Sequence, residues 1–413
     1  MANNLNKKKF MKFSTLGLKL PIESSLIVHT VTLTAYLAAS TAPTPLYRLY
    51  QAQWHFSSVM LTLIFGIYAL ALLSALLVAG SISDYIGRRP IISIALALEL
   101  AAMGLFLTAG GPSWLITARA LQGVATGLAT AALGAALIDL DRERGALTNG
   151  LSTMGGMAIG ALGTTALVQL APAPLHLVFI LLLLFFFVQL LQTWRTPETS
   201  ESRPGVLGSL RPSVAIPKRA RATLLAITPI NVAVWALGGF YLSLMPSLIA
   251  MTTKSTSVWL GGLNVATLTL CGGLAIFLVR RSNAFWALVI GAVMLMIGMS
   301  IILAGANLGL TVVLLTGSAI AGVGFGSGFL GAIRSIVPLA EPTERAGLMA
   351  AFYVESYLAN SIPAILAGYM AQHLDLLSVA NLYGSSLILL SFIGFVLALF
   401  RARGTHRRAS TIA

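Results

Sequence analysis

Charged residues are scarce in this chain of 413 residues, since Asp, Glu, Lys and Arg together make up only 9% of it. An ordinary water-soluble protein contains about 25% charged residues. Hydrophobic residues account for 57% of the chain, and the mean hydropathy is +0.89. Because there is too little polar surface to cover a particle in water, the composition predicts an integral membrane protein whose apolar side chains face lipid.

Cysteine is represented by Cys271 alone, which excludes a disulfide framework and a cysteine-based metal site. We expect no metal and no bound cofactor. The first 22 residues contain five lysines but lack the short apolar core and the small-residue cleavage site of a secretory signal. We interpret residues 1–22 as a basic cytoplasmic tail.

Long apolar runs fill the rest of the chain. A helix needs about 20 mostly apolar residues to cross a bilayer. Twelve stretches qualify, and they predict an all-α fold of twelve transmembrane helices: 24–46, 58–79, 90–110, 114–138, 146–170, 175–194, 222–249, 258–279, 284–304, 309–335, 346–370 and 377–400. The proline- and arginine-rich segment 195–221 is the longest break, so we predict six-helix units at 23–194 and 222–400, and a basic C-terminal tail at 401–413.

The distribution of positive charge predicts the orientation of these helices. With both termini in the cytoplasm, 22 of the 26 Lys and Arg residues fall on the cytoplasmic side. Arg48 and Lys254 fall outside, whereas Arg119 and Arg334 lie within predicted helices. Membrane topology and contact with anionic lipid therefore explain the net charge of +14, and we expect no nucleic-acid partner. The pattern predicts a multi-pass protein of a bacterial-type inner or plasma membrane.

The two halves of the chain resemble each other at an offset of about 200 residues. Residues 142–147 read RERGAL and residues 343–348 read TERAGL. Residues 122–127 likewise match residues 321–326 in their glycine pattern. The shared offset predicts two parallel six-helix repeats, an arrangement known among secondary transporters.

The strongest local motif is the short loop Gly80-Ser81-Ile82-Ser83-Asp84-Tyr85-Ile86-Gly87-Arg88-Arg89-Pro90 between the second and third predicted helices. Glycine permits a tight turn, and aspartate can pair with an arginine or accept from helix-end amides. An ordinary charged cytoplasmic turn is the alternative, but that alternative does not require this spacing.

The loop resembles the signature motif of the major facilitator superfamily, Gly-x-x-x-Asp-x-x-Gly-Arg-Arg/Lys. The resemblance implies two pseudo-symmetric six-helix bundles that transport by alternating access, with a loop that latches the outward-open state. The implied latch residues are Gly80, Asp84, Gly87, Arg88, Arg89 and Asp139. It further implies that Asp84 faces the cytoplasmic end of the eleventh helix and that Asp139 is the arginine's partner.

A second resemblance lies in the fourth predicted helix, where Arg119-Ala120-Leu121-Gln122-Gly123 matches the Arg-x-x-Gln-Gly motif of proton-coupled members of that superfamily. Arg119, Gln122 and Thr126 share one helix face. A buried arginine is expensive in lipid, so we expect it to face a cavity or a partner. Alternatively, Arg119 reaches the outer headgroups.

Two acidic residues lie deep within predicted helices, and both could carry protons. Glu355 is about nine residues into the eleventh helix, and Glu99 is at a similar depth in the third. The alternatives are structural ion pairs of Glu355 with Arg334 and of Glu99 with Arg119. His29 is the titratable side chain of the first helix, and it either relays protons or is a hydrogen-bonded structural residue.

Polar and aromatic side chains recur at helical spacing in several spans and mark candidate cavity faces, although such stripes also occur in ordinary packing. The candidate cavity residues are Tyr36, Gln122, Thr126, Asn231, Trp235, Asn264, Arg334, Tyr353 and Asn360. A pocket with few charges and several aromatics suits an amphiphilic or weakly charged organic substrate.

These patterns predict proton-coupled export of a small amphiphilic organic compound by a monomer, with the proton gradient as energy source. The motifs come closest to bacterial drug/proton antiporters. An importer or facilitator of a small metabolite without proton coupling is the main alternative. A polytopic membrane enzyme or receptor is a remote one, because the five histidines are scattered and no nucleophile–base pair is readable.

Overall fold

The computed structural model describes residues 20–255, 257–341 and 343–410, so most of the predicted N-terminal tail lies outside the described residues. Twelve helices of 17 residues or more dominate this part of the chain. They are α1 (Ile22–Thr41), α3 (Ser58–Ala79), α5 (Arg88–Leu107), α6 (Pro112–Leu140), α7 (Arg142–Leu170), α8 (Leu177–Thr193), α10 (Lys218–Ser243), α12 (Val258–Val279), α13 (Ala284–Leu308), α14 (Thr311–Ile336), α15 (Arg345–Met370) and α16 (Leu376–Ser410).

Ten helical stretches in the described part of the chain are long and apolar enough to cross a membrane. The remaining two long helices are α8, an apolar helix of 17 residues, and α15, which has 26 residues. The middle of α15 contains Glu355, Asn360 and Pro363, which lower its hydropathy. At the other end of the chain, α16 continues as a helix past residue 400, where the sequence predicts the start of a tail.

Short helices fill the connections, namely η1 (Thr44–Leu46), α2 (Tyr47–Trp54), α4 (Ser83–Ile86), α9 (Val206–Ser209), α11 (Met245–Thr253) and η2 (Val337–Leu339). They correct two predicted spans. The run 24–46 is helical only to Thr41, because Pro43 and Pro45 turn the chain through η1. The run 222–249 breaks after Ser243, and Pro246 then occupies the first turn of α11, where a missing N–H costs nothing.

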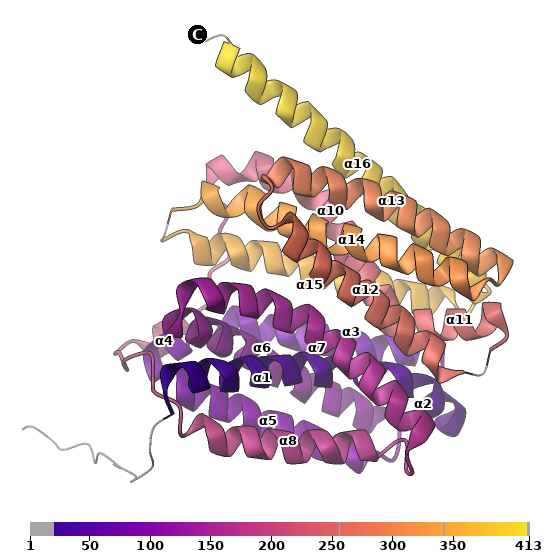
Figure 1. Cartoon of the computed structure of the whole chain (residues 1–413), viewed down its shortest axis with the longest axis horizontal. Coiled ribbons are helices and arrows are strands. Elements are labelled where there is room, and N and C mark those ends of the chain that lie inside the picture. Colours follow the sequence, from indigo (N-terminus) through magenta and orange to yellow (C-terminus); the bar gives the residue numbers. More distant parts are fainter. Residues whose placement is uncertain (1–19, 256, 342, 411–413) are drawn as a thin grey trace, which may run out of the picture.

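The helices form two stacked bundles, with α1–α8 in the lower layer of Figure 1 and α10–α16 in the upper layer. The two bundles repeat the same packing. Gly123 and Gly127 of α6 lie against the backbone of α3, and Gly322 and Gly326 of α14 lie against the backbone of α12. Close helix approach through small residues explains why the sequence matches in these two segments.

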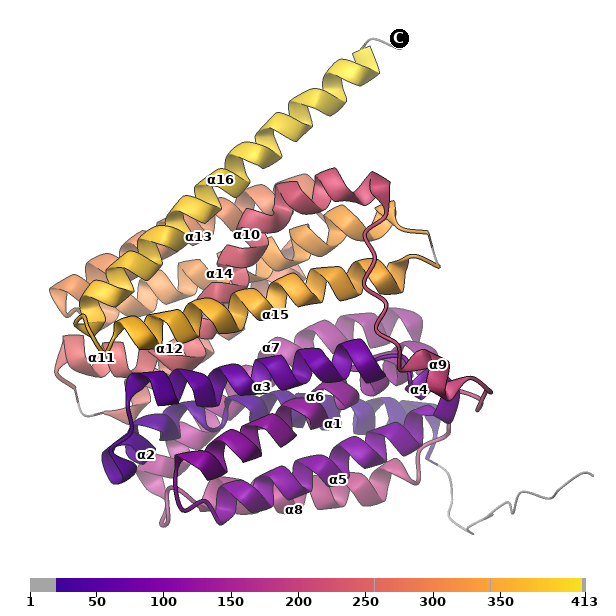
Figure 2. The same ribbon diagram turned by 180° about the vertical axis from the view of Figure 1, so that it is seen from behind.

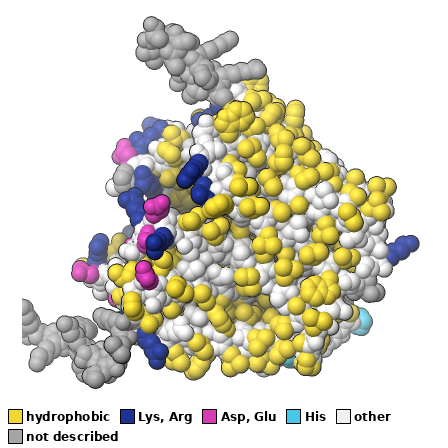
Figure 3. Space-filling view, in the orientation of Figure 1, with side chains coloured by type: hydrophobic (Ala, Val, Ile, Leu, Met, Phe, Trp, Pro, Cys, Tyr) yellow, Lys and Arg dark blue, Asp and Glu magenta, His cyan; other side chains and the backbone are white. Residues whose placement is uncertain are grey.

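The bundles meet along two helix pairs, α3 with α15 and α7 with α12 (Figures 1 and 2). The pairs are related by the repeat, since α3 corresponds to α12 and α7 to α15. Charged side chains gather at one end of the molecule, which we call the charged end, while apolar side chains cover most of the remaining face in Figure 3. The charged end holds α4 and α9, and the opposite end holds α2 and α11 (Figure 2).

The two bundles are in contact at the end opposite the charged end. There the Thr44 hydroxyl of η1 donates to the carbonyl of Leu242 in α10 over 3.2 Å. Gly368 of α15 lies so close to α3 that a Cβ atom would meet the Thr62 hydroxyl at 2.1 Å. The structure is therefore closed between the bundles at this end.

Candidate functional site

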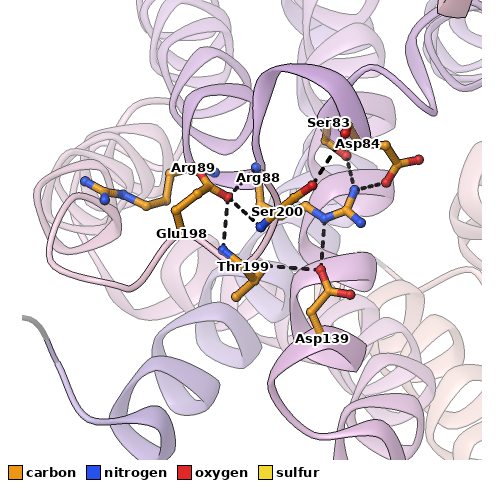
Figure 4. A network of polar contacts seen from close by, with 8 residues as sticks. All are labelled: Ser83, Asp84, Arg88, Arg89, Asp139, Glu198, Thr199 and Ser200. Carbon is orange, nitrogen blue, oxygen red and sulfur yellow. Dashed lines mark hydrogen bonds and ion pairs between the residues drawn. The ribbon is translucent and has the colours of Figure 1, made fainter. Parts of the chain in front are cut away.

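The signature loop forms a polar network at the charged end (Figure 4). Arg88, at the start of α5, is central to it. Its Nη1 lies 2.5 Å from Asp84 Oδ1 and donates to the Ser83 hydroxyl, and its Nε lies 3.1 Å from Asp139 Oδ2 at the end of α6. The guanidinium is largely buried, and the carboxylates of Asp84 and Asp139 balance its positive charge. The loop thus fastens α4 and α5 to α6.

Glu198, in the segment between the bundles, is a functional candidate that the sequence analysis missed. Its carboxylate accepts from the backbone N–H groups of Arg88, at 2.7 Å, and Arg89, at 3.0 Å. These amides are free at the first turn of α5, where a negative charge is also favoured by the helix dipole. Glu198 therefore caps α5 from a distant part of the chain.

Gly87 is required at its position for two reasons. Its φ of 110° with ψ of 154° is a conformation that side-chain-bearing residues rarely adopt. A Cβ atom there would also lie 2.8 Å from Glu198 Oε2. The signature glycine and the cap by Glu198 therefore depend on each other.

Other residues near Glu198 also attach the segment between the bundles to the first bundle. The Thr199 hydroxyl donates to Asp139 over 3.1 Å, and the N–H of Arg203 donates to the carbonyl of Tyr85 over 2.8 Å. Arg89 donates to the carbonyl of Trp194, and its guanidinium lies 5.1 Å from the centre of that indole ring. The segment between the bundles is thus bound to the signature loop through both side chains and backbone.

The family resemblance implied that Asp84 faces the cytoplasmic end of the eleventh helix. Its side chain is half exposed and pairs with Arg88 on its own loop. Its short helix, α4, packs on α5 and α9. The expected orientation of Asp84 towards the start of α15 stays a prediction, since the contacts of Asp84 and its helix in this conformation are with Arg88, α5 and α9.

A second polar cluster is enclosed within the first bundle. Arg119 Nη1 donates to Gln122 Oε1 over 2.6 Å and to the carbonyl of Ser40, and Gln122 Nε2 donates to Glu99 Oε1 over 3.1 Å. All three side chains are at most 1% exposed. The predicted ion pair of Glu99 with Arg119 is wrong, because Gln122 lies between the two charges. Arg119 does not reach the headgroups either.

An aromatic ring covers one face of the Arg119 guanidinium. The centre of the Tyr68 ring in α3 lies 4.0 Å from the guanidinium carbon. A cation above an aromatic face gains about 0.5–2 kcal/mol. Tyr68 was not singled out in the sequence, because a tyrosine in an apolar run gives no signal of its partner.

The candidate residues of the first helix lie inside this bundle, not along the contact between the bundles. His29 is 1% exposed, and Tyr36 is fully buried with its ring 5.1 Å from that of Phe186 in α8. Thr32, one helical turn before Tyr36 in α1, donates to Gln189 of α8 over 2.8 Å. Thr126 is also buried and donates to the Gln122 carbonyl. Tyr36 is thus packed inside the first bundle in this conformation, and its place on a cavity face stays a prediction.

The third polar cluster surrounds Glu355, where α15 packs on α10. Its Oε2 accepts from the Thr228 hydroxyl and its Oε1 from Asn231 Nδ2, both over 3.0 Å. Asn231 also donates to the Ser356 hydroxyl. All of these partners are neutral. The predicted pair of Glu355 with Arg334 is wrong, because Arg334 instead donates to the carbonyls of Arg280 and Ser282 after the end of α12.

Four aromatic rings from α10, α14 and α15 contact one another, and one of them, Trp235, lies one helical turn after Asn231, the partner of Glu355. Trp235 of α10 is 4.9 Å from Tyr357 and 6.1 Å from Phe329, measured between ring centres, and Tyr357 is 6.2 Å from Tyr353. Asn360 donates to the Trp235 carbonyl over 3.1 Å and holds this part of α10 against α15. We call Trp235, Phe329, Tyr353 and Tyr357 the aromatic cluster.

The aromatic cluster reaches the first bundle through Tyr357, which packs against the group formed by Tyr68, Ala69 and Leu72 of α3. Tyr68 therefore contacts Arg119 on one side and the aromatic cluster on the other. A row of side chains therefore leads from the buried charge of the first bundle across the contact between the bundles to the aromatic cluster.

Asn264, the remaining candidate, belongs to a buried network within the second bundle. Its Oδ1 accepts from the Ser318 hydroxyl over 2.7 Å, and Ser318 in turn lies 2.6 Å from the Tyr241 hydroxyl. These three residues join α12, α14 and α10. Asn264 thus has a packing role in this conformation.

Comparison with known proteins decides the family. The model of the Major Facilitator Superfamily matches residues 28–309, which is more than half of the chain. The chain belongs to the Major Facilitator Superfamily. The resemblance carried by the signature loop is thus confirmed, and the protein is a multi-pass membrane transporter, not an enzyme.

A solved structure supports the same fold. The crystal structure of a point mutant of the nucleoside transporter NupG matches the present structure with a TM-score of 0.70 at 13% sequence identity. The match covers 91% of the present chain and 100% of the NupG chain. No curated protein matches the present chain in sequence. At this identity the match establishes the fold, and the substrate has to be argued from the site.

Proposed function

We propose that this protein is a proton-coupled secondary transporter that exports a small amphiphilic organic compound by alternating access. All twelve long helices cross a bacterial-type inner or plasma membrane, both termini lie in the cytoplasm, and the charged end is the cytoplasmic end. The protein acts as a monomer. The concentration of arginines at the charged end supports this orientation.

The observation that carries the proposal is the pair of membrane-embedded carboxyl groups whose hydrogen-bond partners are neutral. Glu99 is bound by Gln122, and Glu355 is bound by Thr228 and Asn231. Neither has an ion pair among the described residues. Intramembrane carboxyl groups of this kind are costly and mark proton or substrate pathways.

Glu355 is the first candidate for the coupling residue. It is partly exposed and is bound by Asn231, which lies one helical turn before Trp235 of the aromatic cluster, whereas Glu99 is fully enclosed. A substrate with aromatic or aliphatic surface would pack on Trp235, Tyr353 and Tyr357, next to the carboxyl group. Proton and substrate would then compete for the same place, which is the requirement for antiport.

The test is proton movement in proteoliposomes with an imposed pH gradient, while amphiphilic compounds are screened as substrates. We expect addition of a substrate to trigger proton release by the wild-type protein. In Glu355→Gln this release should fall by at least about tenfold. Glu143→Gln, which alters an exposed acid at the start of α7, serves as the matched control. Substrate movement without any proton signal in the wild type would contradict coupling.

Uptake or facilitated diffusion of a small metabolite is the second candidate function. The enclosure of Glu99 and the hydrogen bonds that immobilise Glu355 favour it, because both carboxyl groups are then structural. Oriented vesicles distinguish the two. Inward movement of substrate down its own gradient, independent of pH in both the wild type and Glu355→Gln, would support the second candidate.

A further inference from the structure

A cavity of about 160 Å³ lies between the two bundles at the end opposite the charged end. Its walls come from η1 and α2 of the first bundle and from α11 and α12 of the second. Pro45, Arg48 and Ala52 line one side, and Pro246, Ser257 and Gly261 line the other. This place is separate from the aromatic cluster and from the signature loop, and neither of them accounts for it.

Arg48 gives the cavity its chemical character. The arginine is partly buried, and it takes part in no ion pair and no hydrogen bond among the residues that the structure describes. A guanidinium carries five N–H donors in a fixed plane and matches a carboxylate in a bidentate arrangement. Partial desolvation without a partner is unfavourable, so the site favours an anion.

The other walls are mostly apolar. Pro45, Leu49, Pro246, Ile249 and Val258 present hydrocarbon, and Ser257 is the other polar side chain among the described lining residues. An apolar cavity of about 150 Å³ in another protein admits benzene. The volume here therefore accommodates an organic group of about six carbons, and it is too apolar for a bare inorganic anion to fill.

We propose that this cavity is a binding site for a small organic anion, a carboxylate of about the size of benzoate, with its carboxylate on Arg48 and its hydrocarbon between the two prolines. Because both bundles supply the walls, the bound anion bridges them beside the contact between Thr44 and Leu242. Binding stabilises the form that is closed at this end. The proposal does not require proton coupling or a particular direction of transport.

The experiment measures binding to the full-length protein in an uncharged detergent. Benzoate is titrated calorimetrically, alongside benzamide as its neutral isostere and inorganic phosphate as an anion without hydrocarbon. We expect benzoate to bind more tightly than either comparison compound. Arg48→Gln should weaken benzoate binding by about tenfold or more, which is about 1.4 kcal/mol. Arg48→Lys should retain part of the affinity.

Two further variants separate loss of the site from loss of folding. Lys254→Gln removes the other basic residue at this end, which does not line the cavity, and should bind benzoate like the wild type. Ala52→Leu fills the cavity from the side of α2 and should abolish binding. Thermal unfolding without ligand checks that each variant is folded.

Equal benzoate affinity in wild type and Arg48→Gln would overturn the proposal, as would equal binding of benzamide or preferential binding of phosphate. Repeating the titration in nanodiscs identifies the source of the anion. Loss of benzoate binding in phosphatidylglycerol but not in phosphatidylcholine would assign the site to a lipid headgroup and overturn a soluble anion as the occupant. These results are independent of the proton measurements, so this proposal and the proposed function can fail separately.

Discussion

At the scale of single residues, the central question is how a buried arginine and a buried glutamate coexist without pairing. Gln122 answers it, because its amide oxygen faces Arg119 and its amide nitrogen faces Glu99. An amide can satisfy a donor and an acceptor at once, which no hydrophobic residue and no single charge can do. The family motif thus has a local physical basis here: the glutamine separates two groups that would otherwise meet.

The first prediction concerns this glutamine. Gln122→Leu leaves Glu99 and Arg119 each without one partner, and an unsatisfied buried group costs about 1–3 kcal/mol. We expect the variant to unfold at a temperature several degrees lower in detergent. Thr130→Val on the same helix is the control, since Thr130 bonds only to backbone carbonyls of α6. Equal unfolding temperatures for Gln122→Leu and the control would refute the role of Gln122.

The second prediction concerns Gly87. An alanine there has to adopt a backbone conformation reserved for glycine, which costs about 1–3 kcal/mol, and its Cβ displaces Glu198. We expect Gly87→Ala to destabilise the protein, and to do so less when Glu198 is already replaced by alanine. A double-mutant cycle of thermal unfolding measures this coupling. Strict additivity would show that the cap and the glycine are independent.

At the scale of helices, the sequence predicts most of the fold because apolar length is a local property. The runs 58–79 and 258–279 coincide with α3 and α12. The first run was drawn too long because hydropathy does not register that Pro43 and Pro45 force a turn. The charge count also agrees with a single charged end (Figure 3).

The site was less predictable than the helices. The spacing of the motifs identifies the signature loop and Gln122 in the sequence, but it does not identify their partners. Glu198 lies 110 residues from Arg88 in sequence, and Tyr68 meets Arg119 only because Gly123 lets α3 approach α6. The wrong ion pairs, Glu99 with Arg119 and Glu355 with Arg334, arose because the sequence shows which charges are available but not which neutral side chains lie nearer.

The third prediction concerns the start of α16. Asp375 caps this helix by accepting from the Ser378 hydroxyl over 2.6 Å and from the Ser378 N–H over 2.9 Å. These hydrogen bonds hold the pKa of Asp375 below its ordinary value of 3.8. The stabilisation by the carboxylate is therefore complete above that value and is lost as the pH falls through the lower pKa of the folded state.

Thermal unfolding across pH tests this cap. We expect Asp375→Ala to unfold at a lower temperature than the wild type at pH 7, and the difference to shrink once the pH falls below about 4. Asp375→Asn keeps an acceptor without the charge and should lie between the two. A difference between wild type and Asp375→Ala that does not change with pH would contradict the charged cap.

At the scale of the whole molecule, the segment between the bundles is fastened at both ends. On the side of the first bundle, Glu198 binds the signature loop, Thr199 binds Asp139 of α6, and the carbonyl of Ser209 accepts from Ser81. Near its end, the N–H of Ala215 donates to the carbonyl of Gly347 in the second bundle. Arg219, at the start of α10, pairs with Glu341 and Glu344 just before α15.

This arrangement limits how far the bundles can separate at the charged end. Six residue steps lead from Ser209 to Ala215, and a fully extended chain covers about 20 Å over that length. Alternating access requires the bundles to separate and approach at this end. The docked segment is therefore a strap, and the hydrogen bonds that hold residues 198–209 on the first bundle, the Glu198 cap among them, keep its free part short.

The last prediction follows from the strap. Glu198→Ala removes two of the hydrogen bonds that dock the strap, so the rest of the docked part, held by Thr199, Arg203 and Ser209, detaches more readily and the charged end opens wider. Spin labels at positions 147 and 278, introduced with Cys271→Ser, report the separation of α7 and α12 at this end; Leu147 and Leu278 are both exposed. We expect a longer and broader distance distribution in Glu198→Ala than in Glu201→Ala, which removes a neighbouring exposed acid.

Insertion of six Gly and Ser residues after Pro212 should lengthen the distance in the same way, because it extends the strap without touching the cap. If the insertion alone widens the distribution, the length of the strap matters but Glu198 does not set it; if neither change widens it, packing of α3 on α15 and α7 on α12 sets the opening instead.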